Sequence, residues 1–149
     1  MENQLRKILE DINFIERYNL LVEKYKNKEK LLKNYDYQEV LKLIEGLGYQ
    51  ANYNRKEDFF AIKINVGHLI IQLNISLKYS IVELILAVYE GDTVCEVGGP
   101  FAYIARLLNQ QRINATPKFD TYETLREILM NAFQIIEDIK TGLLSSHLL

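Results

Sequence analysis

Residues Phe59–Ser76 read FFAIKINVGHLIIQLNIS, and this stretch predicts a strand pairing by itself. Gly67-His68, at its centre, is a two-residue link of the Gly-X kind, which suits a type II′ hairpin turn because the first central residue needs a positive φ. Such a turn fixes the register, and the period of two then places eight large apolar side chains on one face of the hairpin. The expected pairs are Val66–Leu69, Ile64–Ile71, Ile62–Leu73 and Phe60–Ile75.

The opposite face of this hairpin is more polar. Its expected cross-strand pairs are Asn65 with Ile70, Lys63 with Gln72, and Ala61 with Asn74. A slip of one residue would turn every side chain to the other face, so the amphipathic pattern specifies the register strongly. The apolar face of such a sheet must be covered, and we expect the helices that precede and follow this stretch in the sequence to cover it.

Length and composition indicate one core. The chain has 149 residues, of which 48% are hydrophobic, and a domain of this size buries roughly 70% of its unfolded surface without needing a disulfide or a metal. One cysteine excludes an internal disulfide, no apolar run approaches the ~20 residues of a membrane helix, and no early apolar stretch is followed by a small-residue cleavage site. We therefore expect a cytoplasmic protein without a membrane partner. A net charge of -2 argues against nucleic acid as a direct partner.

Helical periodicity predicts two helices before the sheet. Residues 2 to about 33 read as a helix whose Lys-rich second half is an exposed end or a bend. A second helix follows Asp36, which can cap it while Glu39 completes a capping box, and Gly46 and Gly48 end it. The apolar residues at helical spacing are Leu5, Ile8, Leu9, Ile12 and Ile15 in the first helix and Val40, Leu43, Ile44 and Leu47 in the second.

Strand signals continue on both sides of the hairpin. In residues 49–53, Tyr49, Ala51 and Tyr53 alternate with two polar residues, which predicts a short strand. Residues Tyr79–Glu90 fit helix and strand spacing equally, but Gly91-Asp92 is a second Gly-X link and the following TVCEV reads as a partner strand, so we expect a hairpin. The expected pairs are Val88–Cys95 and Leu86–Val97 on the apolar side, with Tyr89–Val94 and Ala87–Glu96 on the other.

Two further helices are predicted after this hairpin. Pro100 suits the first position of a helix that runs to about Gln110, and Thr116-Pro117 predicts extended chain. The last helix is expected to begin after Asp120 as its cap, with Glu123 at the third position. Lys140 and Gly142 are expected to close that helix.

These elements predict a single α+β domain over residues 1–149. Its sheet is an antiparallel meander of about five strands within residues 49–97. Helical segments flank the sheet at residues 1–47 and 100–143, and residues 144–149 form a tail.

The residues whose side chains could serve in catalysis or metal binding fit structural roles instead. His68 is expected at an exposed turn, far from other titratable groups, and His147 lies in the tail, so neither suggests a general base or a zinc site. Cys95 falls on the inward face of its strand, where burial raises the pKa of a thiol and reduces its reactivity. The glycine turn before Pro100 lacks a phosphate-loop fingerprint. We therefore predict a protein that is not an enzyme, with no catalytic residue, no cofactor and no metal.

One acidic segment that also carries tyrosines stands apart, because helix caps do not explain its carboxylates. Residues Tyr79–Ala105 contain no Lys or Arg. The segment is either a solvated sheet face or a protein interface, in which aromatic anchors beside charges supply affinity and fast association. The candidate partner-binding residues are Glu83, Tyr89, Glu90, Asp92, Glu96, Tyr79 and Tyr103.

The order of elements, together with GGPFAYIARLL (98–108) and FDTYETLREILMNAFQIIEDIK (119–140), resembles small bacterial immunity proteins encoded beside polymorphic toxins, such as those of contact-dependent growth inhibition systems. The resemblance covers most of the chain and is architectural. It carries over no functional residue, since each immunity protein matches its own toxin. It implies a cytosolic, non-catalytic protein that binds a toxin domain, often a nuclease, and blocks its active site or the approach of its substrate.

Three hypotheses therefore stay open. The first is a binding inhibitor of a cognate toxin that uses the acidic segment. The second is a chaperone-like or adaptor module that dimerises through its long helices and holds a peptide on a sheet edge. The third is an enzyme, which would need a pocket with perturbed carboxylates. The sequence leaves the oligomeric state open.

Overall fold

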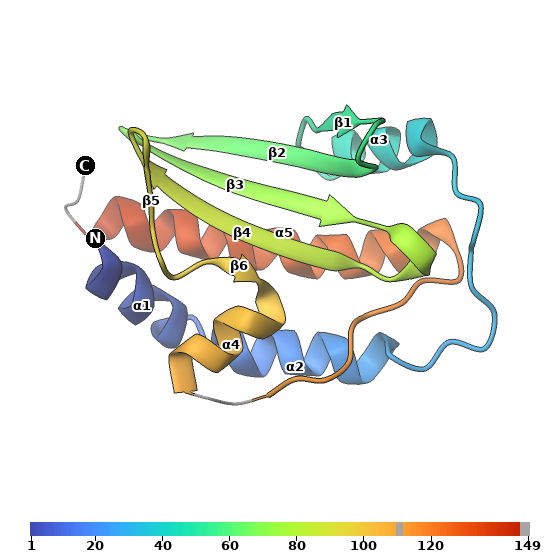
Figure 1. Ribbon diagram of the computed structural model, residues 1–149, viewed down its shortest axis with the longest axis horizontal. Helices are drawn as coiled ribbons and strands as arrows, with labels where there is room; N and C mark the ends of the chain where they lie inside the picture. The colour runs from blue at the N-terminus through green and yellow to red at the C-terminus, as the bar shows by residue number, and fades with distance from the viewer. Residues whose placement is uncertain (110–111, 147–149) are drawn as a thin grey trace.

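The computed structural model describes residues 1–109 and 112–146, and these form a layer of helices packed on one antiparallel sheet (Figure 1). The predicted α+β class is confirmed. The helices are α1 (Glu2–Asp11), α2 (Phe14–Tyr25), α3 (Tyr37–Gly46), α4 (Phe101–Asn109) and α5 (Tyr122–Ser145). The strands are β1 (Asn52–Asn54), β2 (Phe59–Val66), β3 (Leu69–Ser76), β4 (Glu83–Glu90), β5 (Thr93–Val94) and β6 (Gly99–Pro100).

The sheet is a meander in the order β1-β2-β3-β4-β5, with β6 also paired to β4. The predicted β2–β3 register is confirmed over its full length, from Val66 opposite Leu69 to Phe60 opposite Ile75. Gly67 has a φ of 61°, as the expected turn requires. Of the eight apolar side chains on the inner face, all are buried except Ile64, which is half-buried.

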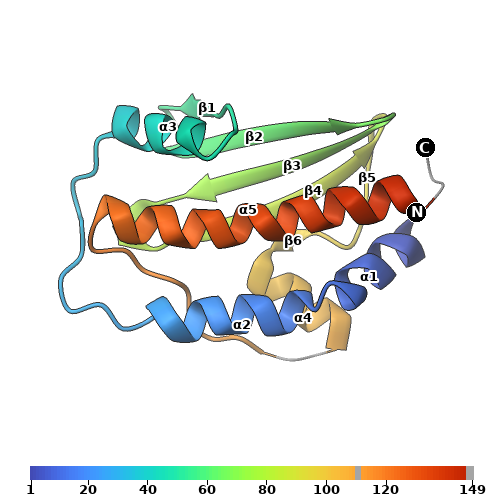
Figure 2. The same cartoon turned by 180° about the vertical axis from the view of Figure 1, so that it is seen from behind.

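The helices cover one face of the sheet and leave the other open. Helix α5 runs behind the sheet in Figure 1 and in front of it in Figure 2. Alternate side chains of β2, β3 and β4 join those of the helices in one hydrophobic core. Four phenylalanines from distant parts of the chain are fully buried in it: Phe14, Phe60, Phe101 and Phe119. The amphipathic pattern of the hairpin therefore sets where the helices lie.

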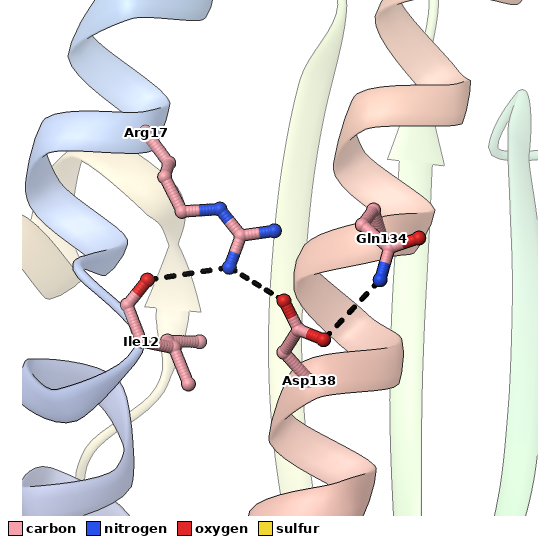
Figure 3. A network of polar contacts seen from close by, with 4 residues as sticks. All are labelled: Ile12, Arg17, Gln134 and Asp138. Carbon is pink, nitrogen blue, oxygen red and sulfur yellow. Dashed lines mark hydrogen bonds and ion pairs between the residues drawn. The ribbon is translucent and has the colours of Figure 1, made fainter.

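The first predicted helix is wrong in its length and continuity. It breaks between α1 and α2 at Asn13, whose φ of 59° and ψ of 45° are left-handed. Arg17 fixes the break, because its Nη1 donates to the Ile12 carbonyl at 3.2 Å and lies 2.8 Å from Asp138 Oδ2 on α5 (Figure 3). Gln134 also donates to Asp138, at 3.2 Å. The break thus turns α2 so that both short helices contact α5.

Helix α2 ends at Tyr25, and the Lys-rich segment after it is not helical. This segment is held by backbone contacts to distant chain instead. The Leu32 N–H donates to the Phe119 carbonyl at 3.3 Å, and the buried Ser80 hydroxyl donates to the Leu32 carbonyl at 2.6 Å. A segment without an apolar stripe gains more from these bonds than from another helical turn.

The caps of α3 and α5 differ in detail from the prediction. Asp36 caps α3 as expected, with its Oδ1 accepting from the Gln38 N–H at 2.9 Å. The capping box does not form, because the Asp36 N–H donates to the Tyr122 hydroxyl at 2.8 Å. Helix α5 is capped by Thr121, whose Oγ1 accepts from the Thr124 N–H at 3.0 Å, so the prediction of Asp120 was one residue early.

Residues 83–90 form a strand, which confirms the choice made for the ambiguous segment. The predicted register with its partner holds near the turn, where Tyr89 lies opposite Val94 and the Cys95 N–H donates to the carbonyl of Val88, its expected partner, at 2.9 Å. Beyond these contacts the chain bulges, and Leu86 pairs with Gly99 where Val97 was expected. Pro100 belongs to β6, so α4 begins one residue later than predicted. The predicted end of α4 at Gln110 lies outside the described residues.

The predicted end of α5 is also wrong, because the helix continues past Gly142 to Ser145. A Cβ added at Gly142 would lie 2.7 Å from Ile8 Cγ2 on α1. Real Cβ atoms do not approach other atoms so closely. Glycine is therefore needed at this position for the packing of α1 on α5, and it does not end the helix.

We predict that Gly142→Ala lowers the free energy of unfolding by about 1–3 kcal/mol, because overpacking outweighs the gain in helix propensity. Gly46→Ala is the matched control. That position is also helical, has nothing within 4 Å of the added Cβ, and should be neutral or stabilising by up to about 1 kcal/mol. Urea denaturation measures both variants. Equal effects of the two substitutions would contradict the close packing of α1 on α5.

Candidate functional site

The face of the sheet that the helices leave uncovered is a candidate binding surface (Figure 1). Every residue that alternation places on this face in β2, β3 and β4 is exposed or half-buried. Its middle is polar but has little charge, since Gln72 donates to Asn74 there at 3.0 Å. Lys63 and Glu83 are the charged residues on this face of the three strands. Lys63 pairs with Gln72 in the middle of the sheet, and Glu83 lies at the end of β4 away from the two hairpin turns.

At the end with the two hairpin turns, an apolar row crosses the open face. The register aligns Ile70 of β3 with Tyr89 of β4, and Tyr89 with Val94 of β5. Ile70 and Tyr89 are half-buried, and Val94 is 48% exposed. These three side chains form a small apolar strip that lies open to solvent.

Three of the candidate acids lie at the same end of the sheet as this strip, but alternation places Glu90 on the opposite face of β4, where it pairs with Leu69 and lines a pocket with Glu2 and Cys95. Glu90 ends β4, Asp92 lies in the turn, and Glu96 follows β5, and all three are exposed. The prediction that His68 lies far from titratable groups is wrong, because its Nε2 lies 2.9 Å from Glu90 Oε2. Of the seven residues predicted from the sequence, Tyr89 and these three acids lie at one end of the sheet. We call this group the acidic tip: Tyr89, Glu90, Asp92 and Glu96.

The other three candidates lie elsewhere. Glu83 shares the open face with Tyr89, but it is six residues away along β4, which is roughly 20 Å. Tyr79 precedes β4, is 83% exposed and has a left-handed φ of 60°. Tyr103 is 45% exposed on α4 and packs against Gly99. The seven predicted residues therefore do not form one surface.

Glu2 is the residue that the sequence analysis missed. Its Oε1 accepts from the Glu96 N–H at 2.6 Å, and its Oε2 accepts from the Val97 N–H at 3.2 Å. One carboxylate thus satisfies both amides where the chain bulges after β5. Bonds from backbone amides to a charged acceptor are the stronger kind, so Glu2 fixes the backbone of the acidic tip to α1.

Cys95 lies beneath this bulge and is buried, as predicted. Burial, with the charge of Glu2 as the next cause, raises the pKa of the thiol to about 11. The thiolate is the reactive form, so Cys95 is almost entirely unreactive at neutral pH. The geometry assigns this thiol to packing under the tip.

A second feature lies at the opposite end of the molecule. The carboxylate of Asp58 accepts from the Tyr35 and Tyr53 hydroxyls, each at 2.7 Å. Burial, followed by the bond to Asp58, raises the pKa of Tyr53 to about 12. These hydroxyls stay protonated at neutral pH and act as donors that hold the turn before β2. Lys33 and Lys78 line a groove of about 590 Å³ beside them.

The described part of the chain contains neither a cluster of potential metal ligands nor a membrane-spanning helix. In residues 1–109 and 112–146, no three His, Cys, Asp or Glu side chains lie close enough together to hold a metal ion. No helix within the same ranges is long and apolar enough to cross a membrane. His147, weighed above as a zinc ligand, lies outside these ranges.

Comparisons with known proteins do not assign the chain to a family. No protein-family model matches it, and neither does any curated protein or solved structure that was compared. The resemblance to immunity proteins stays a prediction. The geometry of the acidic tip is therefore the main basis for a functional proposal.

We predict that Glu2→Gln loosens the acidic tip and speeds the labelling of Cys95 by a thiol reagent several-fold at pH 8. A neutral amide loses both the charge-assisted bonds and the charge that raises the thiol pKa. In the wild type, labelling should be about a hundredfold slower than in denatured protein. The reason is that a pKa of about 11 in place of 9.0 lowers the fraction of Cys95 present as thiolate by about a hundredfold. Glu16→Gln, an exposed acid in the first turn of α2, is the control. Equal rates in the two variants would contradict the role of Glu2.

Proposed function

We propose that this protein is an immunity protein that binds and neutralises a cognate bacterial toxin domain, a nuclease, by covering its active or substrate-binding surface. It acts in the cytoplasm by binding alone, without a cofactor and without catalysis. The observation that carries the proposal is the acidic tip, where three exposed acids lie at the same end of the sheet as the strip of Ile70, Tyr89 and Val94.

This arrangement has the anatomy of a protein interface. Apolar and aromatic side chains supply the contact at the centre, and charged groups at the rim guide association and reject wrong partners. No Lys or Arg occurs from Tyr79 to Ala105, so the segment that forms the tip carries acids and no Lys or Arg, and His68 lies 2.9 Å from Glu90. A nuclease must bind phosphate and carries a basic surface, which complements such a tip.

The tip is held firmly enough to bind without folding first. Its backbone is fixed by the β4–β5 pairing and by the two bonds to Glu2. The three acids are exposed and outside the core, so changing their charge leaves the core packing intact and removes the exposed contact of Glu90 with His68. Preorganisation of this kind reduces the entropy that binding would otherwise cost.

The alternative, a chaperone-like or adaptor dimer that binds a peptide or protein, is favoured by one observation on the helices. Leu20 on α2 is 71% exposed, and Met130 on α5 is 46% exposed. A shallow groove of about 230 Å³ between these helices is lined by Leu20, Lys24 and Gln134. A dimer formed through these helices would be insensitive to charge changes at the acidic tip, which separates the two functions.

The test of the proposal is binding to the toxin domain encoded beside this gene. We predict a tight complex whose Kd rises about a hundredfold at low salt in the triple variant Glu90→Lys, Asp92→Lys, Glu96→Lys, because three rim contacts become repulsive. The control carries the same charge change at the exposed acids Glu10, Glu45 and Glu57 and should bind like the wild type. Isothermal titration calorimetry at two salt concentrations measures all three proteins.

Failure to form a complex with the wild type would overturn the proposed function. Equal weakening in the two triple variants would show that net charge matters and that the acidic tip does not. Nuclease activity in the presence of each variant gives the second readout, because a protein that covers the toxin surface should inhibit in proportion to its binding.

A further inference from the structure

Strand β2 has a free edge. It contains eight residues, but β1 pairs only with Phe59–Ala61, so Ile62–Val66 has a neighbour on the β3 side alone. None of the described residues in another segment hydrogen-bonds the outer side of Ile62–Val66. Both views show β1 and α3 beside one end of β2 and the rest of its edge uncovered by a labelled element (Figures 1 and 2).

This edge has few of the features by which proteins prevent strand pairing. Exposed edges are usually protected by proline, by a bulge or by several charges. Ile62–Val66 contains no proline, is in continuous register with β3 and carries Lys63 as its one charge. At its centre is Ile64, the one inner-face residue of the hairpin that the fold leaves half-buried. The edge is therefore suited to receive another strand.

We propose that a second copy of this chain occupies the edge, with the two β2 strands antiparallel about a two-fold axis at Ile64. Side chains directly opposite each other in such a pair share a face, so both helix layers lie on the same side. Ile64 then packs against its counterpart, and the two Ile64 side chains cover each other. Two six-stranded sheets become one continuous sheet.

The sequence of the edge selects this register. With the axis at Ile64, all five free residues pair, Ile62 lies opposite Val66, and Lys63 lies opposite Asn65. An axis at Lys63 would pair three residues and place two lysines opposite each other, which is repulsive. An axis at Asn65 would also pair only three residues. The Ile64 register is the one that uses the whole edge without opposing like charges.

The dimer is independent of toxin binding, because the acidic tip is formed by β4 and β5 and the edge by β2. It also differs from a dimer through the long helices. A symmetric pairing of two edges satisfies the free backbone groups of both copies at once, which a helical contact would leave exposed to solvent.

The test exploits the Lys63–Asn65 contact, which occurs twice in the dimer. Asn65→Lys should weaken the dimer at least tenfold, Asn65→Glu should tighten it, and the double variant Lys63→Glu, Asn65→Lys should restore it. Both positions are exposed, so the monomer fold is unaffected, and thermal denaturation checks this. Ala87→Lys adds the same charge on the same face two strands away from the edge and is the control.

Sedimentation velocity between about 1 and 200 µM measures the dimer constant of each protein. The expected order of affinity is Asn65→Glu, then wild type, then Asn65→Lys. A wild type that stays monomeric over this range would overturn the proposal. So would equal dimer constants for Asn65→Lys and Asn65→Glu, or a dimer that Ala87→Lys weakens as much as Asn65→Lys does.

Discussion

The structure depends on removing one face of the β2–β3–β4 meander from water. That face consists of large aliphatic and aromatic side chains in continuous register, and each one buried contributes about 2 kcal/mol. An antiparallel meander of three long strands cannot bury its own face, so helices must cover it. The chain supplies them from both ends, with α1 and α2 before the sheet and α4 and α5 after it.

Polar contacts across the chain make this cover specific. Arg17 joins the break between the first two helices to Asp138 on α5, and Ser80 holds the segment after α2 through the Leu32 carbonyl. Glu2 ties α1 to the bulge beyond β5. Each contact satisfies backbone groups or charges at a place where regular structure stops, which is where the hydrophobic pattern alone gives no instruction.

Sequence reasoning was reliable where the deciding interactions are local. Gly67 with its flanking alternation gave the whole β2–β3 register, and Asp36 was correctly placed as a cap. It failed where the partner is distant in the chain. Asp36 bonds to Tyr122, and Glu2 bonds to an amide 94 residues away. Composition also grouped Glu83 with Tyr89, although these two residues are six positions apart along β4 and so lie at opposite ends of it.

In this account the covered face is scaffold, and binding belongs to the acidic tip. Hydrogen–deuterium exchange of the protein with and without the proposed toxin domain tests this division most directly. The account predicts slowed exchange of the amides in residues 89–97, with the groove between α2 and α5 unchanged. Protection confined to that groove or to Ile62–Val66, with none in residues 89–97, would contradict it.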